Sequence, residues 1–377
     1  MRILVALFIY LLIGFKPIQI EAQTNNLSTI SVGWRHAVAI GTDGSLWTWG
    51  ENRFGQLGDG STTNRNTPTR IGRETNWASV TAGNDYTLAI KADGSLWAWG
   101  NNFSGQLGDG TSGPFNRRLT PTRIGTATNW ISVSAGSDYT VAIRSDGSLW
   151  VWGRKTVKYF GHIIQDYGST PTRIGIASNW LSVSAGWSHT LAIRTDGSLW
   201  AWGENNFGQL GDGTTNNHTS PVRVGNATNW ALISAGHDHS LAVREDGSLW
   251  AWGQNNIGML GDGTTINRLI PTRIGTSLNW TNVSAGQFRS LAIRSDGSLW
   301  AWGDLFVGTL ENNYNDGERK NTPTQIGSET NWISVFEGRL SYIVGIRFDG
   351  SFWAWGGNPE RLFGDGTVNR QPVQIMP

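Results

Sequence analysis

The stretch Asp93–Gly100 reads DGSLWAWG, and its pattern of Asp-Gly-Ser, an apolar residue and Trp-x-Trp-Gly occurs seven times in the chain. The aspartates that begin the copies are 50, 53, 50, 50, 50 and 53 residues apart: Asp43, Asp93, Asp146, Asp196, Asp246, Asp296 and Asp349. A fixed period of this length indicates a solenoid, a propeller or an array of equivalent units. Because a residue that recurs in every copy builds the copy, we expect a singular activity only where the copies differ.

The second copy shows how one unit folds. Two runs with apolar alternation, Trp77–Ala82 and Thr87–Lys91, are predicted strands. Asp93-Gly94 then forms the turn into a third strand, Ser95–Trp99, because an Asp-Gly pair between two apolar runs favours a tight hairpin. A glycine-rich connection leads to a fourth strand that begins at Pro121, where the missing N–H costs no ladder hydrogen bond.

Tryptophan supplies the predicted core. Of the 22 Trp residues, 14 belong to the Trp-x-Trp pairs and six follow Asn, so that only Trp34 and Trp187 stand outside the repeat. The chain has no cysteine, so no disulfide strengthens it, and each buried indole removes about 150–250 Å² from water. We therefore predict an all-β fold: one seven-bladed β-propeller of four-stranded blades over residues 23–377. The sequence leaves open whether the two terminal strands share a blade.

The N-terminal residues 1–22 resemble a secretory signal peptide. Arg2 precedes the apolar stretch Ile3–Phe15, and Ile20–Ala22 offers a cleavage site. The alternative is a membrane anchor, but this stretch is short of the roughly 20 residues that cross a bilayer. We thus expect an exported protein, secreted, periplasmic or at the cell surface, without a membrane span after cleavage. A net charge of +1 and the lack of a basic run give no support for nucleic-acid binding.

Several motifs together resemble the regulator-of-chromosome-condensation repeat family. They are the GQLGDG segments at 55–60, 105–110 and 208–213, the Pro-Thr-x-Ile strand, the Ala-Gly that ends the first strand, and the DGSLWxWG hairpin. The resemblance covers nearly all of residues 26–377. It implies a seven-bladed propeller that works as a binding platform. The founding member is a nucleotide-exchange factor for a small GTPase, so an exchange-factor-like regulator is an alternative function if the N-terminus is not a signal peptide.

Three variable residues follow the Ala-Gly of each copy, and we call these segments the trios. They are Trp34-Arg35-His36, Asn84-Asp85-Tyr86, Ser137-Asp138-Tyr139, Trp187-Ser188-His189, His237-Asp238-His239, Gln287-Phe288-Arg289 and, with one residue more, Arg339-Leu340-Ser341-Tyr342. Because they join equivalent strands, the trios of a closed ring lie on one rim. Their aromatic, Arg, Asp and His content is typical of interface hot spots, although solvent-facing loop variation gives the same pattern.

We predict that a protein or surface ligand of unknown identity binds this rim. The predicted contact residues are Trp34, Arg35, His36, Asp85, Tyr86, Asp138, Tyr139, Trp187, His189, His237, Asp238, His239, Phe288, Arg289, Arg339 and Tyr342. The connections at 154–164 and 304–314 depart from GQLGDG, either as extensions of that rim or as drifted loops.

Catalytic and metal-binding signals are weak. His237 and His239 are two residues apart, with His36 and His189 on the same rim, but neither cysteines nor carboxylates at ligand spacing accompany them. The repeated Asp-Gly pairs are explained by turn geometry rather than by calcium. There is no nucleophile elbow and no phosphate-binding loop. We therefore predict a monomeric, non-enzymatic scaffold without cofactor or metal; the alternative is a hydrolase or lyase with its site in the propeller mouth.

Overall fold

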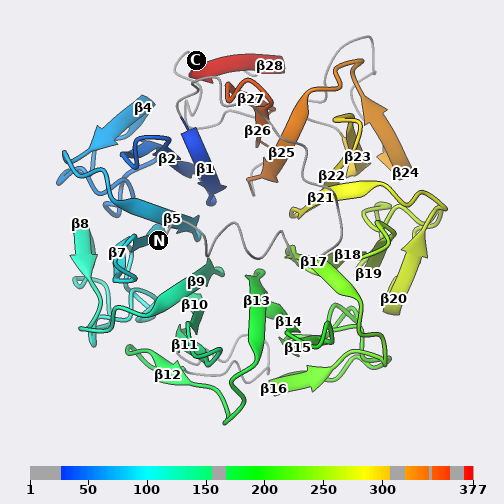
Figure 1. Cartoon of the computed structure of the whole chain (residues 1–377), viewed down its shortest axis with the longest axis horizontal. Helices are drawn as coiled ribbons and strands as arrows, with labels where there is room; N and C mark the ends of the chain where they lie inside the picture. Colours follow the sequence, from blue (N-terminus) through cyan, green and yellow to red (C-terminus); the bar gives the residue numbers. More distant parts are fainter. Residues whose placement is uncertain (1–26, 155–166, 306–318, 339–341, 357–368, 377) are drawn as a thin grey trace.

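A computed structural model describes residues 27–154, 167–305, 319–338, 342–356 and 369–376. In these residues 28 strands form seven antiparallel sheets arranged as a ring, and no helix is present (Figure 1). Each sheet contains four strands that are consecutive in the sequence. The predicted all-β, seven-bladed propeller of four-stranded blades is confirmed.

The four strands of each blade lie side by side in sequence order, the first at the centre of the ring and the fourth at its periphery (Figure 1). The innermost strands are β1 (Leu27–Val32), β5 (Trp77–Ala82), β9 (Trp130–Ala135), β13 (Trp180–Ala185), β17 (Trp230–Ala235), β21 (Trp280–Ala285) and β25 (Trp332–Glu337). The second strands are β2 (His36–Gly41), β6 (Tyr86–Lys91), β10 (Tyr139–Arg144), β14 (His189–Arg194), β18 (His239–Arg244), β22 (Arg289–Arg294) and β26 (Tyr342–Arg347).

The outer half of each blade is the hairpin strand and an edge strand. The third strands are β3 (Leu46–Gly50), β7 (Leu96–Gly100), β11 (Leu149–Gly153), β15 (Leu199–Gly203), β19 (Leu249–Gly253), β23 (Leu299–Asp304) and β27 (Phe352–Gly356). The edge strands are β4 (Arg65–Ile71), β8 (Arg118–Arg123), β12 (Thr172–Arg173), β16 (His218–Arg223), β20 (Arg268–Ile274), β24 (Arg319–Ile326) and β28 (Asn369–Met376).

The first and last blades are each built from their own four strands. Blade 1 is β1–β4 and blade 7 is β25–β28, so the two ends of the chain share no sheet. Side chains close the ring instead: Ile30 and Trp49 of blade 1 pack in one buried cluster with Val344 and Phe352 of blade 7. The question that the sequence left open is thus answered by packing between separate blades.

The core lies between neighbouring blades. Val38 and Leu46 of blade 1, for example, pack against Trp77 and Trp99 of blade 2. The second tryptophan of every hairpin is fully buried in such a seam: Trp49, Trp99, Trp152, Trp202, Trp252, Trp302 and Trp355. Because both faces of a blade are covered, its second strand is buried along its length.

The Asp-Gly-Ser turn is held by its own side chains. In blade 2, the backbone N–H and the hydroxyl of Ser95 both donate to Asp93, at 2.9 and 2.6 Å, and the indole of Trp97 donates to the same hydroxyl at 2.9 Å. These bonds to Ser95 hold the pKa of Asp93 below its ordinary value. Gly94 adopts φ +77°, and a side chain there would collide with the carbonyl of Thr128.

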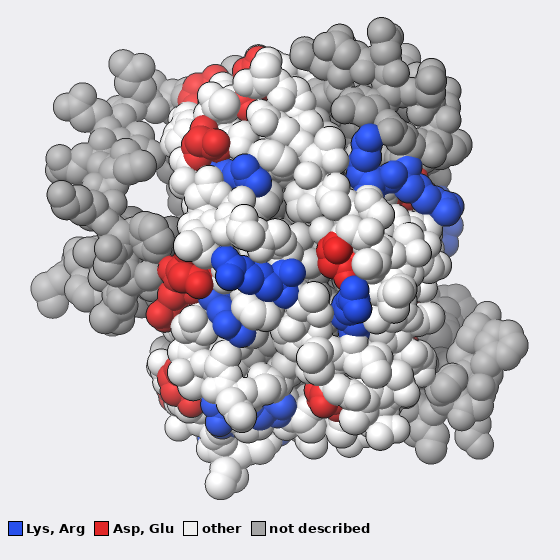
Figure 2. Space-filling view, turned by 90° about the vertical axis from the view of Figure 1, so that its right-hand side faces the viewer, with Lys and Arg blue, Asp and Glu red and all other residues white. Residues whose placement is uncertain are grey.

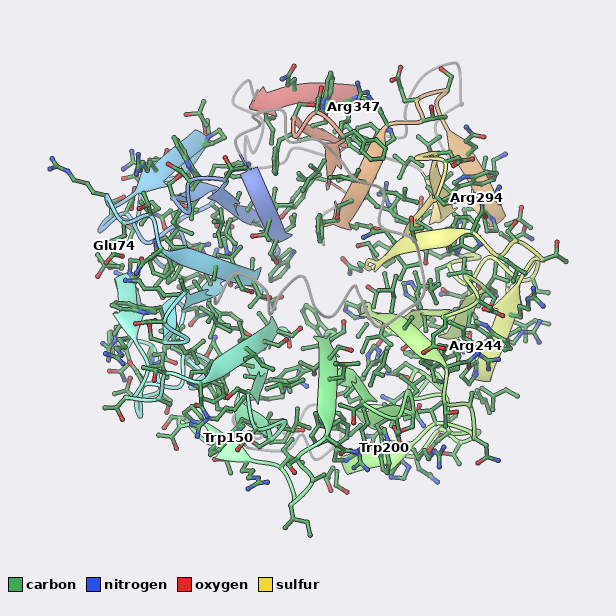
Figure 3. The ribbon with its side chains drawn as sticks, in the orientation of Figure 1. Glu74, Trp150, Trp200, Arg244, Arg294 and Arg347 are labelled. Atoms are coloured by element: carbon green, nitrogen blue, oxygen red, sulfur yellow. The ribbon has the colours of Figure 1, made fainter. Side chains whose placement is uncertain are left out.

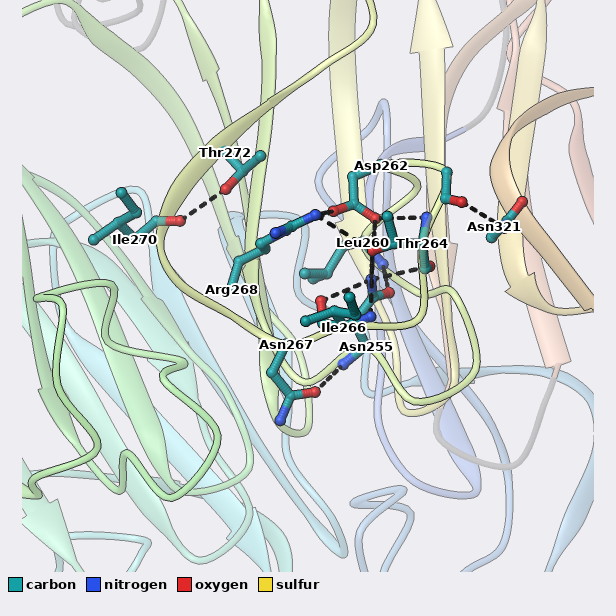
Figure 4. A network of polar contacts seen from close by, with 11 residues as sticks. Asn255, Leu260, Asp262, Thr264, Ile266, Asn267, Arg268, Ile270, Thr272 and Asn321 are labelled. Carbon is teal, nitrogen blue, oxygen red and sulfur yellow. Dashed lines mark hydrogen bonds and ion pairs between the residues drawn. The ribbon is translucent and has the colours of Figure 1, made fainter.

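The connection between the third and fourth strands is organised by one buried asparagine (Figure 4). In blade 5, the Asn255 amide donates to Asp262 and to the carbonyl of Thr264, both at 3.1 Å, and accepts from the N–H of Leu260 at 2.9 Å. Arg268 of β20 pairs with Asp262 at 2.6 Å. Blades 1, 2 and 4 repeat the arrangement with Asn52, Asn102 and Asn205. The glycine-rich connection between the third and fourth strands therefore has a structural explanation, because these hydrogen bonds hold it in place.

The outer surface carries both signs of charge. On the flank that Figure 2 shows, Lys and Arg side chains are interspersed with Asp and Glu, as the balanced composition predicts. In the part of the chain that the structure covers, no helix has the length and apolar character needed to cross a membrane. The predicted signal peptide, residues 1–22, lies outside the described residues.

Candidate functional site: the trio face

The trios lie together at one end of the ring, which we call the trio face. Each trio follows the end of a first strand, and all seven blades share one antiparallel order. The backbone links neighbouring trios: the N–H groups of Trp34 and Trp187 donate to carbonyls of Gly83 and Gly236 in the next blade, at 3.2 and 3.0 Å. The Asp-Gly turns occupy the opposite end, which we call the hairpin face.

The last residue of every trio is buried rather than displayed. Its exposed fraction is 3% or less in all seven copies: His36, Tyr86, Tyr139, His189, His239, Arg289 and Tyr342. This position begins the second strand, which neighbouring blades cover on both faces. The prediction that these seven side chains contact a partner is therefore wrong.

Three of these residues are histidines that bond to a hydroxyl of the next blade. The Nε2 atoms of His36, His189 and His239 each lie 2.9 Å from the hydroxyl oxygen of Thr87, Ser240 and Ser290, respectively. Each of these hydroxyls donates its own proton to a backbone carbonyl, at 2.7–2.8 Å. It therefore accepts from the histidine, so the proton of each neutral ring is on Nε2.

The same histidines are held neutral by their surroundings. Burial lowers the pKa of His36 and His239 to about 3 and that of His189 to about 4. Because an imidazolium would be desolvated there and would also need an acceptor at Nδ1, the uncharged form fits the seam. These residues lock blades together and are not available to a metal.

Tyrosines link three of the other seams. Tyr86 donates to the carbonyl of Tyr139, Tyr139 donates to that of His189 at 2.7 Å, and Tyr342 donates to that of Gly33 at 2.8 Å. The last of these bonds joins blade 7 to blade 1. With the histidines and Arg289, they form a closed circle of seven polar links between neighbouring blades.

The seam between blades 6 and 7 carries a buried ion pair. Nε of Arg289 lies 3.1 Å from Oε1 of Glu337, and the two side chains are 2% and 1% exposed. Glu337 stands where five other copies have alanine, and Ile343 stands where most have Thr or Ser. Desolvation raises the pKa of Glu337, and Arg289 opposes that rise. Gly286 is required here because a side chain would overlap the carboxylate.

The first trio residues of three blades meet over the centre of the ring. The indoles of Trp34 and Trp187, from blades 1 and 4, are in edge-to-face contact with ring centroids 6.2 Å apart. His237 of blade 5 stacks on Trp187 at 4.6 Å and lies 2.6 Å from a carboxylate oxygen of Asp238. We call Trp34, Trp187 and His237 the aromatic cap. All three are partly exposed.

Beside His237 of the cap lies a cavity of about 100 Å³, which is lined by the inner strands of all seven blades and so lies on the axis of the ring. Small residues at the ends of the innermost strands surround it: Val32, Ala82, Ala135, Ala185, Ala235 and Ala285. His237, Gln287 and Glu337 add the polar lining. The seventh strand therefore differs from the other six by contributing a carboxylate.

The second trio residues give the rim its charge. Arg35 lies 3.7 Å from Glu51 and stands over the ring of Trp34 at 5.6 Å. Burial and, next, the charge of Glu51 raise the pKa of Asp85 to about 6. Phe288 is 45% exposed. Asp138 and Asp238 are also partly exposed, whereas Arg339 lies outside the described residues.

Eight of the predicted contact residues are thus within reach of a partner, and their role remains a prediction. They are Trp34, Arg35, Asp85, Asp138, Trp187, His237, Asp238 and Phe288. Of the two divergent connections, Arg154 and Asp304 are described and most of the remainder is not. Arg154 reaches Ser137 at 2.8 Å and the carbonyl of Trp187 at 3.1 Å, which places it beneath the rim.

No metal-binding cluster of His, Asp and Glu side chains occurs among the described residues. His237 and His239, two apart in sequence, do not converge: one stacks in the aromatic cap and the other bonds to Ser290 in a seam.

The model of the RCC1-like domain matches residues 12–231 and 124–377, which together span most of the chain. The chain belongs to the RCC1-like domain family. This confirms the resemblance that the GQLGDG segments and the DGSLWxWG hairpins indicated.

Individual relatives of this RCC1-like propeller are more distant. The ultraviolet-B receptor UVR8 of Arabidopsis thaliana is 43% identical over 56 residues, which are 15% of this chain and 13% of the receptor. Yeast RCC1 (Prp20), solved with Kap60, aligns with a TM-score of 0.77 and 21% identity over 96% of this chain and 90% of that chain. Human WBSCR16 aligns with a TM-score of 0.75 and 20% identity over 88% and 94%. Identities this low show the fold alone. Prp20p of Saccharomyces cerevisiae has also been studied for its binding to Gsp1p and histones.

Proposed function

We propose that this RCC1-like propeller is an exported, non-enzymatic scaffold that binds a protein or a cell-surface ligand through its trio face. The observation that carries the proposal is the aromatic cap. Trp34 and Trp187 are the two tryptophans outside the repeat, and they meet in the middle of one face although 153 residues separate them. Neither side chain belongs to the buried apolar clusters between blades, where the repeated tryptophans pack.

The cap and its surroundings have the chemistry of an interface centre. Indoles bury a large area at little cost in side-chain entropy, and Trp is enriched among residues that dominate binding energy. Arg35, Asp85 and Asp238 around them supply charges of both signs, which set orientation more than affinity. Because the circle of polar links holds the ring rigid, the surface is formed before a partner arrives.

The test replaces the cap while leaving the seams intact. We expect Trp34→Ala with Trp187→Ala to weaken the binding of a purified partner by about 100-fold or more, the effect of losing hot-spot residues. The matched control is Ile333→Ala with Phe348→Ala, which removes two exposed apolar side chains from the hairpin face. Equal affinities for the cap variant and the wild type, both folded, would reject the trio face as the binding site.

Export is tested separately, by sequencing the N-terminus of the mature protein from the native cells. A mature chain that starts at or near Gln23 supports export. A chain that retains residues 1–22 in the cell interior would instead favour the exchange-factor-like alternative, to be measured as nucleotide release from small GTPases. Turnover of a hydrolase or lyase substrate by the wild type would support an enzyme.

A further inference from the structure

The hairpin face contains a second repeated arrangement, distinct from the trios. In six blades, the last residue of the second strand is a cation held between two indoles: Lys91, Arg144, Arg194, Arg244, Arg294 and Arg347. In blade 4, the guanidinium carbon of Arg194 lies 4.4 Å from the ring centroid of Trp180 and 3.7 Å from that of Trp200. Figure 3 labels members of this set around the ring.

Five consecutive blades carry an arginine on the edge strand, directly opposite the hairpin tryptophan. Blades 1 and 2 pair Trp47 with Arg70 and Trp97 with Arg123. Blades 3, 4 and 5 pair Trp150 with Arg173, Trp200 with Arg223 and Trp250 with Arg273. Blades 3, 4 and 5 thus carry Trp, Arg, Trp and Arg from the inner to the outer strand, whereas the second strand ends in Gly41 in blade 1 and in Lys91 in blade 2. In blades 6 and 7 the corresponding edge residues are Gln325 and Gln374.

The inner cations also differ in how they are neutralised. Lys91 of blade 2 pairs with Glu74 at 2.8 Å, and Arg347 of blade 7 lies 3.8 Å from Glu329. In blades 3, 4 and 5 the position of these glutamates is taken by Ala127, Ala177 and Ala227.

Arg144, Arg194 and Arg244 consequently have no ion-pair partner within 4 Å among the described residues, although each is close enough to its hairpin aspartate to interact electrostatically. All three remain partly exposed, and their Nε atoms are buried without a hydrogen-bond acceptor. The result is an arc of fixed cations, each supported by indoles and each belonging to a partly exposed residue.

We propose that the hairpin face of blades 3–5 binds an acidic polysaccharide, a polymer of sugar rings that bear carboxylates. A guanidinium binds a carboxylate through two parallel hydrogen bonds, and a fixed one loses little entropy on doing so. The partly exposed Trp150, Trp200 and Trp250 beside the arginines offer flat apolar surfaces to the C–H faces of sugars. The same arrangement recurs on three adjacent blades, which suits a ligand whose carboxylates also repeat.

The experiment uses polygalacturonate as the probe, with its fully methyl-esterified form as the uncharged counterpart and poly-glutamate as a polyanion without sugar rings. We expect the full-length protein to bind polygalacturonate, more weakly as salt is added, and to ignore the ester. Arg194→Gln with Arg244→Gln is expected to weaken binding about tenfold, whereas Arg194→Lys with Arg244→Lys, which keeps the charges but loses the paired hydrogen bonds, is expected to weaken it less.

The matched control is Arg347→Gln, which removes an equivalent stacked cation that Glu329 already neutralises. It is expected to leave the affinity unchanged, and near-ultraviolet circular dichroism verifies that every variant is folded. Equal losses in Arg347→Gln and in the double variant would overturn the proposal. Equally tight binding of poly-glutamate or of the ester would also overturn it, and so would the absence of polygalacturonate binding at low salt.

Discussion

The seam between blades 4 and 5 and the seam between blades 6 and 7 solve one problem in two ways. In the first, neutral His189 donates to Ser240. In the second, Arg289 pairs with the carboxyl group of Glu337, and both side chains have almost no contact with water. The positions are equivalent, so the difference lies in what the next blade supplies: a hydroxyl at Ser240, and only methyl groups at Ile343.

The comparison shows that the type of a buried polar residue in a seam depends on the side chain that the next blade presents to it. Where a hydroxyl is present, a histidine is satisfied without charge. In the seam between blades 6 and 7, where Ile343 supplies no hydroxyl, the carboxyl group of Glu337 on the adjoining first strand is the acceptor instead. Because desolvation of two charges offsets much of their attraction, the ionic seam is not the stronger of the two, but it is the more sensitive to losing one partner.

Glu337→Ala is expected to have the largest effect. It leaves the Arg289 guanidinium buried without a counter-charge, so the free energy of unfolding should fall by about 3–5 kcal/mol. The matched change in the neutral seam, Ser240→Ala, removes one hydrogen bond and should cost about 1–2 kcal/mol. Urea denaturation of both variants measures the two losses. Equal losses would mean that Arg289 finds another acceptor when Glu337 is removed.

Acid should weaken the histidine seams next. The folded-state pKa values of His36, His189 and His239 lie near 3–4, below the ordinary 6.5, so the folded protein binds fewer protons than the unfolded chain. The stability that each contributes is complete above pH 6.5 and is lost as the pH falls toward 4, by about 2 kcal/mol per histidine at pH 5. Melting temperatures between pH 7.5 and 5 measure this loss.

The control for the acid effect is His189→Gln, which keeps a donor toward Ser240 and cannot titrate. Its melting temperature should fall less steeply with pH than that of the wild type. Glu337 and Asp85, whose pKa values are raised, act in the opposite direction and lose stability as the pH rises. An unchanged slope in His189→Gln would show that other groups dominate acid unfolding.

The smallest effect is expected from converting one seam into the other. Arg289→His combined with Glu337→Ala and Ile343→Ser gives the seam between blades 6 and 7 the residues of the seam between blades 5 and 6. Replacing a buried ion pair by satisfied neutral groups is often close to neutral, so the free energy of unfolding should change by about 1 kcal/mol or less. A large loss on urea denaturation would show that the seams are not interchangeable and that Glu337 has a role in the central cavity.

The fold was predictable because its signal is repeated. The Asp-Gly turn, the alternating Trp-x-Trp and the constant period each indicate the same blade, and seven copies leave little room for another architecture. Ring closure was not predictable, since the sequence does not reveal whether β1 pairs with β2 alone or also with a strand from the other terminus.

The trio face was only partly predictable. Reading each trio as a loop overlooked that its third residue starts the second strand, and that every residue of that strand lies between two blades. His189 carried a signal for this: it begins the run HTLAI, all of which is buried. Glu337 was not predicted because the variable residues were expected only after the Ala-Gly pair. In blade 7 the alanine of that pair is itself replaced, by Glu337. The contact of Trp34 with Trp187 depends on where blades 1 and 4 lie across the ring, which no local pattern encodes.

The way the ring closes has a mechanical consequence. Because β1 and β28 belong to different sheets, a force that pulls the two ends of the chain apart acts on the seam between blades 7 and 1, where the described links are side-chain packing and the bonds from Tyr342. Such a seam should yield at lower load than a shared sheet, whose backbone ladder would have to be sheared. Under such a force the propeller would open at the seam between blades 7 and 1, while the other six seams stay intact. It would refold by closing that one seam.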